Sequence, residues 1–274
     1  MFGRTVFGVA LLLLATDALP QSHELPATPP AIDVLIHSPV QLTPIERRKL
    51  RTQIRKFGRG STGEFVRELY QDKGYFKVEV IPISNSDQRL MFQVLPGKQY
   101  HLVGITWTGD TAIVESELKN LIPFTPGELF NRTKIVEGLN TVRNLYGSRG
   151  YINYTCVPTP QTNDDAATIA FEMDVDEGGQ FRFGELDVEG MEEAHRGMLL
   201  SAWQGLRDRP YSRGDADRFF NRFFKSPRPN ITPEDYAIRQ IDEANHLVNY
   251  SLKFVPNFRY RITRSSQLEP VEVP

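Results

Sequence analysis

The chain has 274 residues, of which 40% are hydrophobic and 24% are charged, and its formal net charge is -2. This composition excludes an intrinsically disordered chain, and the length allows two or three domains. The near-neutral charge argues against nucleic acid as a partner, because phosphate binding needs a concentrated positive field.

Residues 1–18 are predicted to be a secretory signal peptide. Arg4 supplies a positive charge, residues 6–15 are apolar apart from Gly8, and Ala18 offers a small residue for cleavage. A membrane anchor is the alternative, but this run is about half of the roughly 20 apolar residues that a spanning helix needs. We therefore expect export with cleavage near Ala18, followed by a linker over residues 19–31.

The next segment, residues 32–97, is predicted to form a first small domain. Its apolar pattern indicates a strand over 32–37, helices over 45–57 and 62–72, and strands over 77–83 and 89–95. The first helix and its exit are strongly basic, with Glu46 as the only acid among Arg47, Arg48, Lys49, Arg51, Arg55, Lys56 and Arg59.

This basic helix has two interpretations, which the sequence leaves open. One is a solvated helix face, and the other is contact with anionic lipid head groups or with an acidic partner. The candidate residues for such contact are Arg47, Arg48, Arg51 and Arg55.

Residues 98–178 are predicted to form a second domain with the same order of elements. In its first strand, Val103, Ile105 and Trp107 are expected to share one face. The apolar pattern then predicts helices over 114–122 and 132–146 and strands over 151–157 and 168–175. The single cysteine, Cys156, falls in the third of these strands, where we expect a buried, apolar role.

Residues 179–256 are predicted to form a third domain, which diverges from the others in its middle part. Strands are predicted over 181–188, 236–242 and 246–255. Where the first two domains have Gly-Tyr after the second helix, this one runs through Pro227 and Pro229, so its second helix must end differently. The remaining residues, 257–274, are predicted as a tail.

The domain prediction rests on an internal repeat. Six positions recur at an offset of 81 residues: Gly97, Tyr100, Leu102, Ile105, Trp107 and Gly109 match Gly178, Phe181, Phe183, Leu186, Val188 and Gly190. A second set, in which Gly74 matches Gly150, recurs at an offset of 76 residues, and both glycines are expected to take a positive φ at a helix end. The predicted fold class is α+β, as tandem strand-helix-helix-strand-strand domains with two helices on a three-stranded mixed sheet.

Catalytic and metal-binding patterns are missing from the sequence. The five histidines lie in different segments without metal-ligand spacing, and neither a nucleophile-elbow pattern nor a phosphate-binding loop occurs. We therefore expect a protein that is not an enzyme and that carries no cofactor and no metal.

The residues resemble the polypeptide-transport-associated (POTRA) family, whose domains stand in tandem ahead of the barrel of BamA-type outer-membrane assembly proteins. The phrases that carry the resemblance are Pro126–Asn131, Tyr146–Tyr151 and the acid-Glu-Gly turn before the strand that ends at Gly190. Because few residues follow Val255, the sequence is expected to correspond to the periplasmic part of that family without the barrel.

The resemblance implies a periplasmic scaffold, associated with the outer membrane, that binds a barrel protein or unfolded outer-membrane polypeptides by strand addition. In the family, the exposed edge is typically the strand after the second helix, which here maps to 77–83, 152–157 and, less directly, 236–242. Pro82 and Pro158 are expected to limit the length of an added ladder. The candidate edge residues are Val78, Val80, Ile81, Asn153, Thr155 and Val157.

Two other functional classes remain open from the sequence. An envelope structural or cell-division protein uses a similar domain behind an uncleaved N-terminal helix, and retention of residues 1–18 would favour it. A carbohydrate- or lipid-binding module would use the basic helix and exposed aromatic side chains, although no spacing in the sequence requires it.

Overall fold

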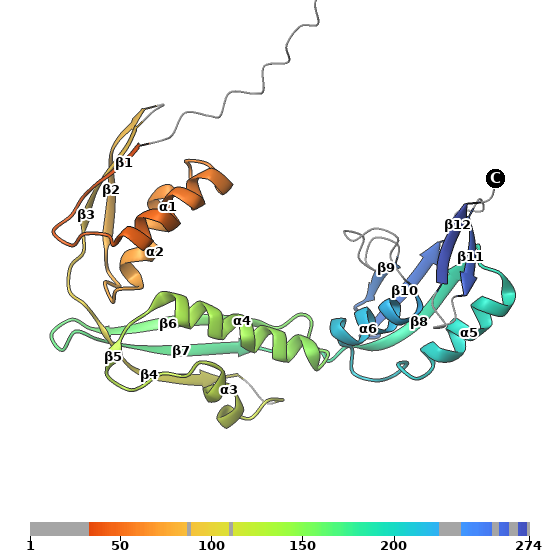
Figure 1. Cartoon of the computed structure of the whole chain (residues 1–274). Coiled ribbons are helices and arrows are strands. Elements are labelled where there is room, and N and C mark those ends of the chain that lie inside the picture. The colour runs from red at the N-terminus through yellow and green to blue at the C-terminus, as the bar shows by residue number, and fades with distance from the viewer. Residues whose placement is uncertain are drawn as a thin grey trace, which may run out of the picture.

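The computed structural model describes residues 33–86, 89–109, 112–224, 237–253, 258–262 and 268–272. Three α+β units follow one another along an elongated chain (Figure 1). The predicted signal peptide and linker, residues 1–31, lie outside the described residues. Each of the three units has its own hydrophobic core, and the predicted fold class is confirmed.

The first unit has a three-stranded mixed sheet in the order β1-β3-β2, in which β1 is parallel and β2 antiparallel to β3. Both helices lie on one face of this sheet and enclose a core that includes Leu50, Ile54, Val66 and Phe92. The elements are β1 (Asp33–His37), α1 (Pro44–Phe57), α2 (Thr62–Gln71), β2 (Glu79–Ser86) and β3 (Arg89–Leu95).

The second unit has a sheet of four strands in the order β5-β4-β7-β6. The additional strand β5 has only two residues, which is too short for a periodic sequence signal. The elements are β4 (His101–Thr108), α3 (Glu115–Leu121), β5 (Glu128–Leu129), α4 (Arg132–Ser148), β6 (Thr155–Asn163) and β7 (Thr168–Asp176).

Strand β4 corrects the prediction that Val103, Ile105 and Trp107 share one face. The pairing of β4 with β7 shifts between Leu102 and Gly104, so Val103 is the extra residue of a β-bulge. As a result Leu102, Ile105 and Trp107 are buried, whereas Val103 is 45% exposed. A bulge changes the alternation of side chains without leaving a mark in the apolar pattern.

The third unit has the sheet order β8-β10-β9 and an aromatic core. Trp203 is at its centre, with ring contacts to Phe183, Phe219 and Tyr250. The elements are β8 (Arg182–Glu189), α5 (Glu193–Trp203), α6 (Arg213–Phe223), β9 (Ala237–Asp242) and β10 (Leu247–Lys253).

The segment predicted as a tail, residues 257–274, contains two short strands. Strand β11 (Phe258–Ile262) pairs antiparallel with β12 (Leu268–Glu272) as a separate two-stranded sheet. The alternation of Phe258, Tyr260 and Ile262 with arginines was the available sequence signal for β11.

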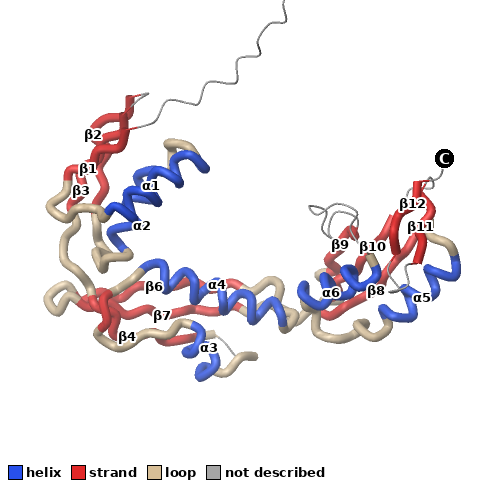
Figure 2. Tube along the Cα trace, in the orientation of Figure 1, coloured by secondary structure: helices blue, strands red, loops and turns tan. Residues whose placement is uncertain are grey.

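The second helices of the three units follow one another, so that α2 contacts α4 and α4 contacts α6 (Figure 2). At each joint the glycine after the helix has a positive φ, 88° for Gly74 and 93° for Gly150. The carbonyl of each glycine accepts a hydrogen bond from the residue just before the first strand of the next unit, Tyr100 N at 2.8 Å and Phe181 N at 2.8 Å. Each joint therefore pairs a glycine from the set that recurs at an offset of 76 residues with an aromatic residue from the set that recurs at an offset of 81 residues.

Each joint also passes one apolar side chain forward into the core of the next unit. Phe76 packs against Phe130 and Phe171 of the second core, and Ile152 packs against the third core. Both residues precede the predicted boundaries, after residues 97 and 178, so the hydrophobic cores do not stop at these positions.

Candidate functional site

The strand after the second helix lies at a sheet edge in all three units. Strands β2, β6 and β9 are each the outermost strand of their sheets. Within the described ranges, no further strand pairs with the outer side of any of the three. An edge of this kind offers unpaired N–H and C=O groups to an extended peptide.

Four of the six predicted edge residues lie in these strands: Val80 and Ile81 in β2, and Thr155 and Val157 in β6. The prediction is wrong for Val78 and Asn153, which precede the strands. The chain is still turning there, since Val78 N donates to Tyr75 O at 3.2 Å. Val78 is buried in the first core.

Asn153 belongs to the joint between the second and third units rather than to the edge. Its Nδ2 donates to the Glu243 carboxylate at 3.1 Å. The turn after Gly150 continues through the hydrogen bond from Tyr154 N to Tyr151 O at 3.3 Å, which delays the start of β6 until Thr155.

Proline positions reveal which backbone groups of β6 face outward. In an antiparallel pair, successive N–H groups point alternately toward and away from the partner strand, and proline has none to donate. Pro158 and Pro160 therefore occupy outward positions, as do Cys156 and Thr162, because the register with β7 is unbroken. The N–H groups of Thr155 and Val157 point toward β7. The outer edge of β6 thus lacks both central donors.

The position of proline also shows which backbone N–H groups of β2 point away from its partner strand, β3. Pro82 lies opposite Phe92, and the register shifts after Pro82. Val80 has the same phase as Pro82 and turns its N–H outward, whereas Ile81 turns its N–H toward β3. The outward ladder of β2 is therefore short.

Strand β9 differs from the other two edges because its six residues contain no proline, and its pairing with β10 has no register shift. Its side chains include two exposed apolar residues, Ile238 at 53% and Ile241 at 42%. Among the three edges, β9 offers the longest uninterrupted run of backbone donors and acceptors.

Helix α1 carries the predicted basic cluster on its exposed surface. Arg47, Arg48, Arg51 and Arg55 are all exposed. Arg47 is tied to the chain before the helix, because its Nε donates to Leu42 O at 3.2 Å and its Nη2 donates to Gln41 Oε1 at 3.1 Å. The N-cap of the helix is Thr43, which forms a capping box with Glu46.

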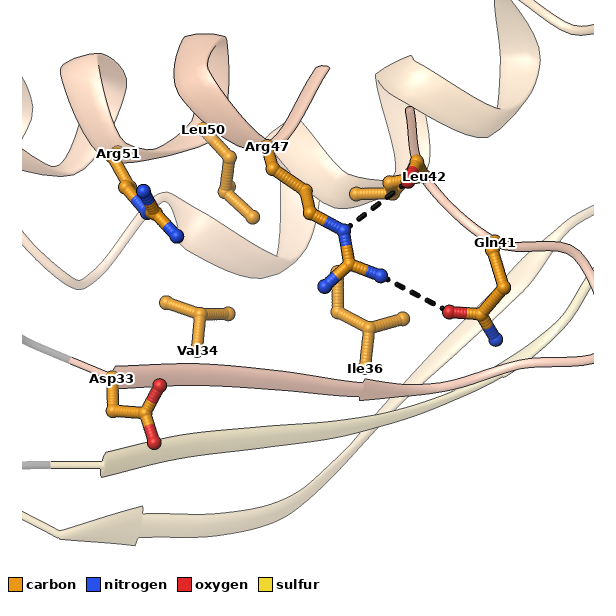
Figure 3. Close-up of a pocket in the computed structure, with 8 residues that line it drawn as sticks. All are labelled: Asp33, Val34, Ile36, Gln41, Leu42, Arg47, Leu50 and Arg51. Atoms are coloured by element: carbon orange, nitrogen blue, oxygen red, sulfur yellow. Dashed lines mark hydrogen bonds between the residues drawn. The ribbon is translucent and has the colours of Figure 1, made fainter. Parts of the chain in front are cut away.

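A small cavity of about 70 Å³ lies between α1 and β1. Figure 3 shows the Arg47 and Arg51 side chains extending from α1 toward β1, with Asp33 on the strand below. The apolar lining comes from Val34, Ile36, Leu42 and Leu50. Its volume is too small for a peptide side chain of ordinary size, so we do not treat it as the polypeptide-binding site.

The turn at Asp164, between β6 and β7, connects two units. The Asp164 carboxylate accepts from Lys77 Nζ at 2.5 Å and from the Tyr100 hydroxyl at 2.7 Å, and so joins the first unit to the second. Hydrogen bonds from Lys77 and Tyr100 lower the pKa of Asp164, and the bond to Asp164 raises the pKa of Lys77. These groups form a salt-bridged contact between units.

Clusters that could hold a metal ion and helices that could span a membrane are both absent from the part of the chain that the structure describes. No group of three or more His, Cys, Asp or Glu side chains there is arranged to hold a metal ion. No helix in the same residues has the length and apolar character needed to cross a bilayer.

Comparison with known proteins gives a family match over the central unit. The POTRA model, described as a surface antigen variable number repeat, matches residues 100–178. The outer membrane protein assembly factor BamA of Neisseria meningitidis serogroup B is 23% identical over 162 residues, 57% of this chain and 20% of that protein. A putative outer membrane protein assembly factor of Treponema pallidum is 20% identical over 215 residues, 73% of this chain and 25% of that protein.

The chain therefore spans between a fifth and a quarter of the length of these relatives. Among solved structures, POTRA domains 3–5 of Haemophilus influenzae BamA match with a TM-score of 0.56 and 18% identity, over 82% of this chain and 96% of that one. This likeness shows a shared fold over three consecutive domains. Residues 100–178 thus match the POTRA family model, and the chain as a whole is similar to a tandem array of BamA-like POTRA domains.

Proposed function

We propose that this chain is a non-enzymatic periplasmic scaffold that binds partner or unfolded polypeptides by strand addition, in outer-membrane protein assembly or secretion. The family and the names of the relatives support the general role. The observation that carries the binding mode is the position of β2, β6 and β9, each of which is the outermost strand of its sheet.

The three edges are not equivalent in this proposal. Two proline residues interrupt the outward face of β6, and Pro82 with the adjacent register shift shortens that of β2. Strand β9 has neither interruption. We therefore assign the main contact to β9, with β2 as a shorter second contact through Val80.

The expected affinity of one edge is low. A ladder on a six-residue strand adds about three to five main-chain hydrogen bonds. Each contributes about 0.5 to 1.5 kcal/mol, and the cost of ordering the peptide offsets much of this gain. A dissociation constant no tighter than roughly tens of micromolar follows for a single edge, and engagement of several units would strengthen binding by avidity.

The expected partners are outer-membrane barrel proteins or their unfolded chains, because barrel strands alternate apolar and polar residues in an extended conformation. Access to them requires export of the protein to the periplasm. N-terminal sequencing of the exported protein tests that part: a start near Leu19 supports it, and a retained Met1 in the inner-membrane fraction favours the anchored alternative.

The test of strand addition is an NMR titration of the full mature chain with an extended peptide of alternating apolar residues. Two variants, Gln240→Pro and Ile241→Pro, change neighbouring positions of β9. Because successive N–H groups alternate in direction, one variant removes an outward donor, and the other breaks the ladder with β10. The variant that loses only the outward donor should stay folded, and its affinity for the peptide is the informative measurement.

We expect shifts centred on β9 in the wild type and at least severalfold weaker binding in the folded variant. Val80→Pro should weaken binding less, and Cys156→Pro least, since the β6 edge already lacks its central donors. Unchanged binding in the folded β9 variant, or shifts confined to α1, would rule out strand addition at this edge.

A further inference from the structure

The outer face of α1 combines positive charge with exposed apolar side chains. At 3.6 residues per turn, the residues opposite the buried Leu50 and Ile54 form one continuous face. All except Thr52 are basic or apolar, and the face consists of Ile45, Arg48, Lys49, Thr52, Arg55 and Lys56.

The positive charge of this face is not balanced locally. Within the described residues, Arg48, Lys49, Arg55 and Lys56 form no ion pair with an acidic side chain. The single acid of the helix, Glu46, pairs instead with Lys73 at 2.8 Å. Partial burial would raise the pKa of Glu46, but hydrogen bonds from Lys73 and Thr43 hold it below its usual range, so this carboxylate stays charged and engaged on the other side of the helix.

Apolar side chains lie at both ends of the same helix and remain exposed. Ile45 in the first turn is 70% exposed and Phe57 at the last position is 58% exposed. The Lys56 ammonium lies 4.9 Å from the centre of the Phe57 ring. A shallow groove beside the basic face, between α1 and α2, is lined by Ile45, Lys49 and Phe65 among others.

We propose that α1 docks on the surface of an anionic lipid bilayer, with its basic outer face in the head-group region and Ile45 reaching the acyl boundary. Helices that lie in the membrane interface combine a basic face with exposed large apolar residues, as α1 does. Long Lys and Arg side chains lie along the interface while their charged ends reach phosphate groups.

A lipid surface suits this face better than nucleic acid or an acidic protein groove. The whole chain has a net charge of -2, whereas nucleic-acid binding depends on a strong positive field. An acidic protein surface would match the charges but leave Ile45 exposed at the centre of the polar contact, whereas a bilayer interface accommodates both features.

The experiment measures co-sedimentation of the full mature chain with vesicles of phosphatidylcholine alone or mixed with phosphatidylglycerol. The charge variant is Arg48→Ala combined with Lys49→Ala and Lys56→Ala. Its matched control is Lys119→Ala combined with Arg143→Ala and Lys253→Ala, which removes the same charge from cations that hydrogen-bond or pair with neighbours on other units.

We expect binding to the phosphatidylglycerol vesicles that weakens as salt rises. Each cation near an anionic surface contributes about 1 kcal/mol, a factor of roughly five, so the charge variant should lose at least about tenfold in partitioning. The control variant should retain wild-type partitioning.

The apolar contribution is tested with Ile45→Ser against Val114→Ser, which changes a side chain of similar exposure, 65%, at the start of α3. We expect a loss of about tenfold or more for Ile45→Ser and none for Val114→Ser, since burial of a large aliphatic side chain contributes at least about 1.5 kcal/mol, a factor of roughly ten.

Three results would overturn the proposal: no binding of the wild type to phosphatidylglycerol vesicles at low salt, equal losses in the charge variant and its control, or full binding by Ile45→Ser. Circular dichroism of each variant checks that α1 is intact. The vesicles contain no peptide, so this result is independent of strand addition at β9.

Discussion

The two joints of the array share a plan but differ in what reinforces it. In both, a glycine with positive φ ends the second helix, its carbonyl accepts from the next unit, and an apolar residue enters the next core. The first joint adds a polar clamp. The Asp72 carboxylate accepts from Thr133 N at 2.8 Å and from Thr133 Oγ1 at 2.9 Å, and thereby caps helix α4 of the following unit.

The second joint lacks this clamp at the equivalent positions. The counterpart of Asp72 is Ser148, whose hydroxyl donates to Leu145 O within its own helix at 2.7 Å, and the counterpart of Thr133 is Gly214. The second joint relies instead on close backbone approach, since a Cβ on Gly150 would lie 2.4 Å from Phe181 O. A repeated architecture therefore tolerates two ways of reinforcing the contact between units: a side-chain cap on the next helix at the first joint, and close backbone approach beside the Asn153–Glu243 hydrogen bond at the second.

The largest expected effect comes from the side chains that cross the joints. Phe76→Ala should destabilise the second unit by about 2 to 4 kcal/mol, because it removes a half-buried ring that contacts Phe130 at 5.3 Å between ring centres. Ile152→Ala should destabilise the third unit by about 1 to 3 kcal/mol. Hydrogen exchange of each unit checks both values.

The control for the ring is Phe57→Ala, whose side chain is exposed and should matter by less than about 0.5 kcal/mol. If Phe76→Ala lowers the hydrogen-exchange protection of the first unit but not of the second, the ring stabilises the first unit. The packing of Phe76 into the second core would then contribute nothing to stability.

The next effect separates steric fit from backbone conformation. Gly150→Ala should cost about 2 to 4 kcal/mol, since a left-handed φ is added to a clash with the backbone at Phe181. Gly74→Ala should cost about 1 to 2 kcal/mol, because its nearest atoms belong to the flexible Leu129 side chain. Gly127→Ala, with a φ of 85° and no atom within 4 Å, measures the cost of the positive φ without a clash. Chemical denaturation of the three variants supplies the comparison, and equal losses for Gly127 and Gly150 would remove the steric argument.

The smallest effect concerns the polar clamp. Asp72→Ser gives the first joint the residue of the second and should lower its stability by about 1 kcal/mol through loss of the cap on α4. The reciprocal double variant, Ser148→Asp with Gly214→Thr, should stabilise the second joint by a few tenths of a kcal/mol. Residual dipolar couplings between neighbouring units report whether their relative orientation tightens or loosens. A double variant that loosens the second joint would show that the clamp depends on more than these two positions.

Much of the fold could be predicted from the sequence because glycines mark the positions of its turns. The recurring glycines Gly97, Gly109, Gly178 and Gly190 all adopt positive φ, as do Gly74 and Gly150. They fix where turns occur, and the apolar periods between them then identify the helices and most strands. Three errors fall where the local pattern has no information: the bulge at Val103, the two-residue strand β5, and the late start of β6, whereas the missed strand β11 does have an alternating pattern.

The candidate site was less accessible from sequence. Which strand is an edge depends on sheet order, and the resemblance, rather than the apolar pattern, supplied it for β2, β6 and β9. The outward N–H of Val80 and the inward N–H of Ile81 follow only from the register around Pro82. The joints bring together residues far apart in the chain, such as Lys77 and Asp164, and no periodicity connects them.

The forward packing of Phe76 and Ile152 gives the array a direction during synthesis. The first core is built from side chains between Val34 and Val94 and is complete before any later unit leaves the ribosome. The second core needs Phe76 and the third needs Ile152. Both residues have already left the ribosome when the second and third units, respectively, begin to fold. Each finished unit thus offers the next one a prepared apolar anchor, whereas a fragment cut at residue 98 or 179 would begin without it.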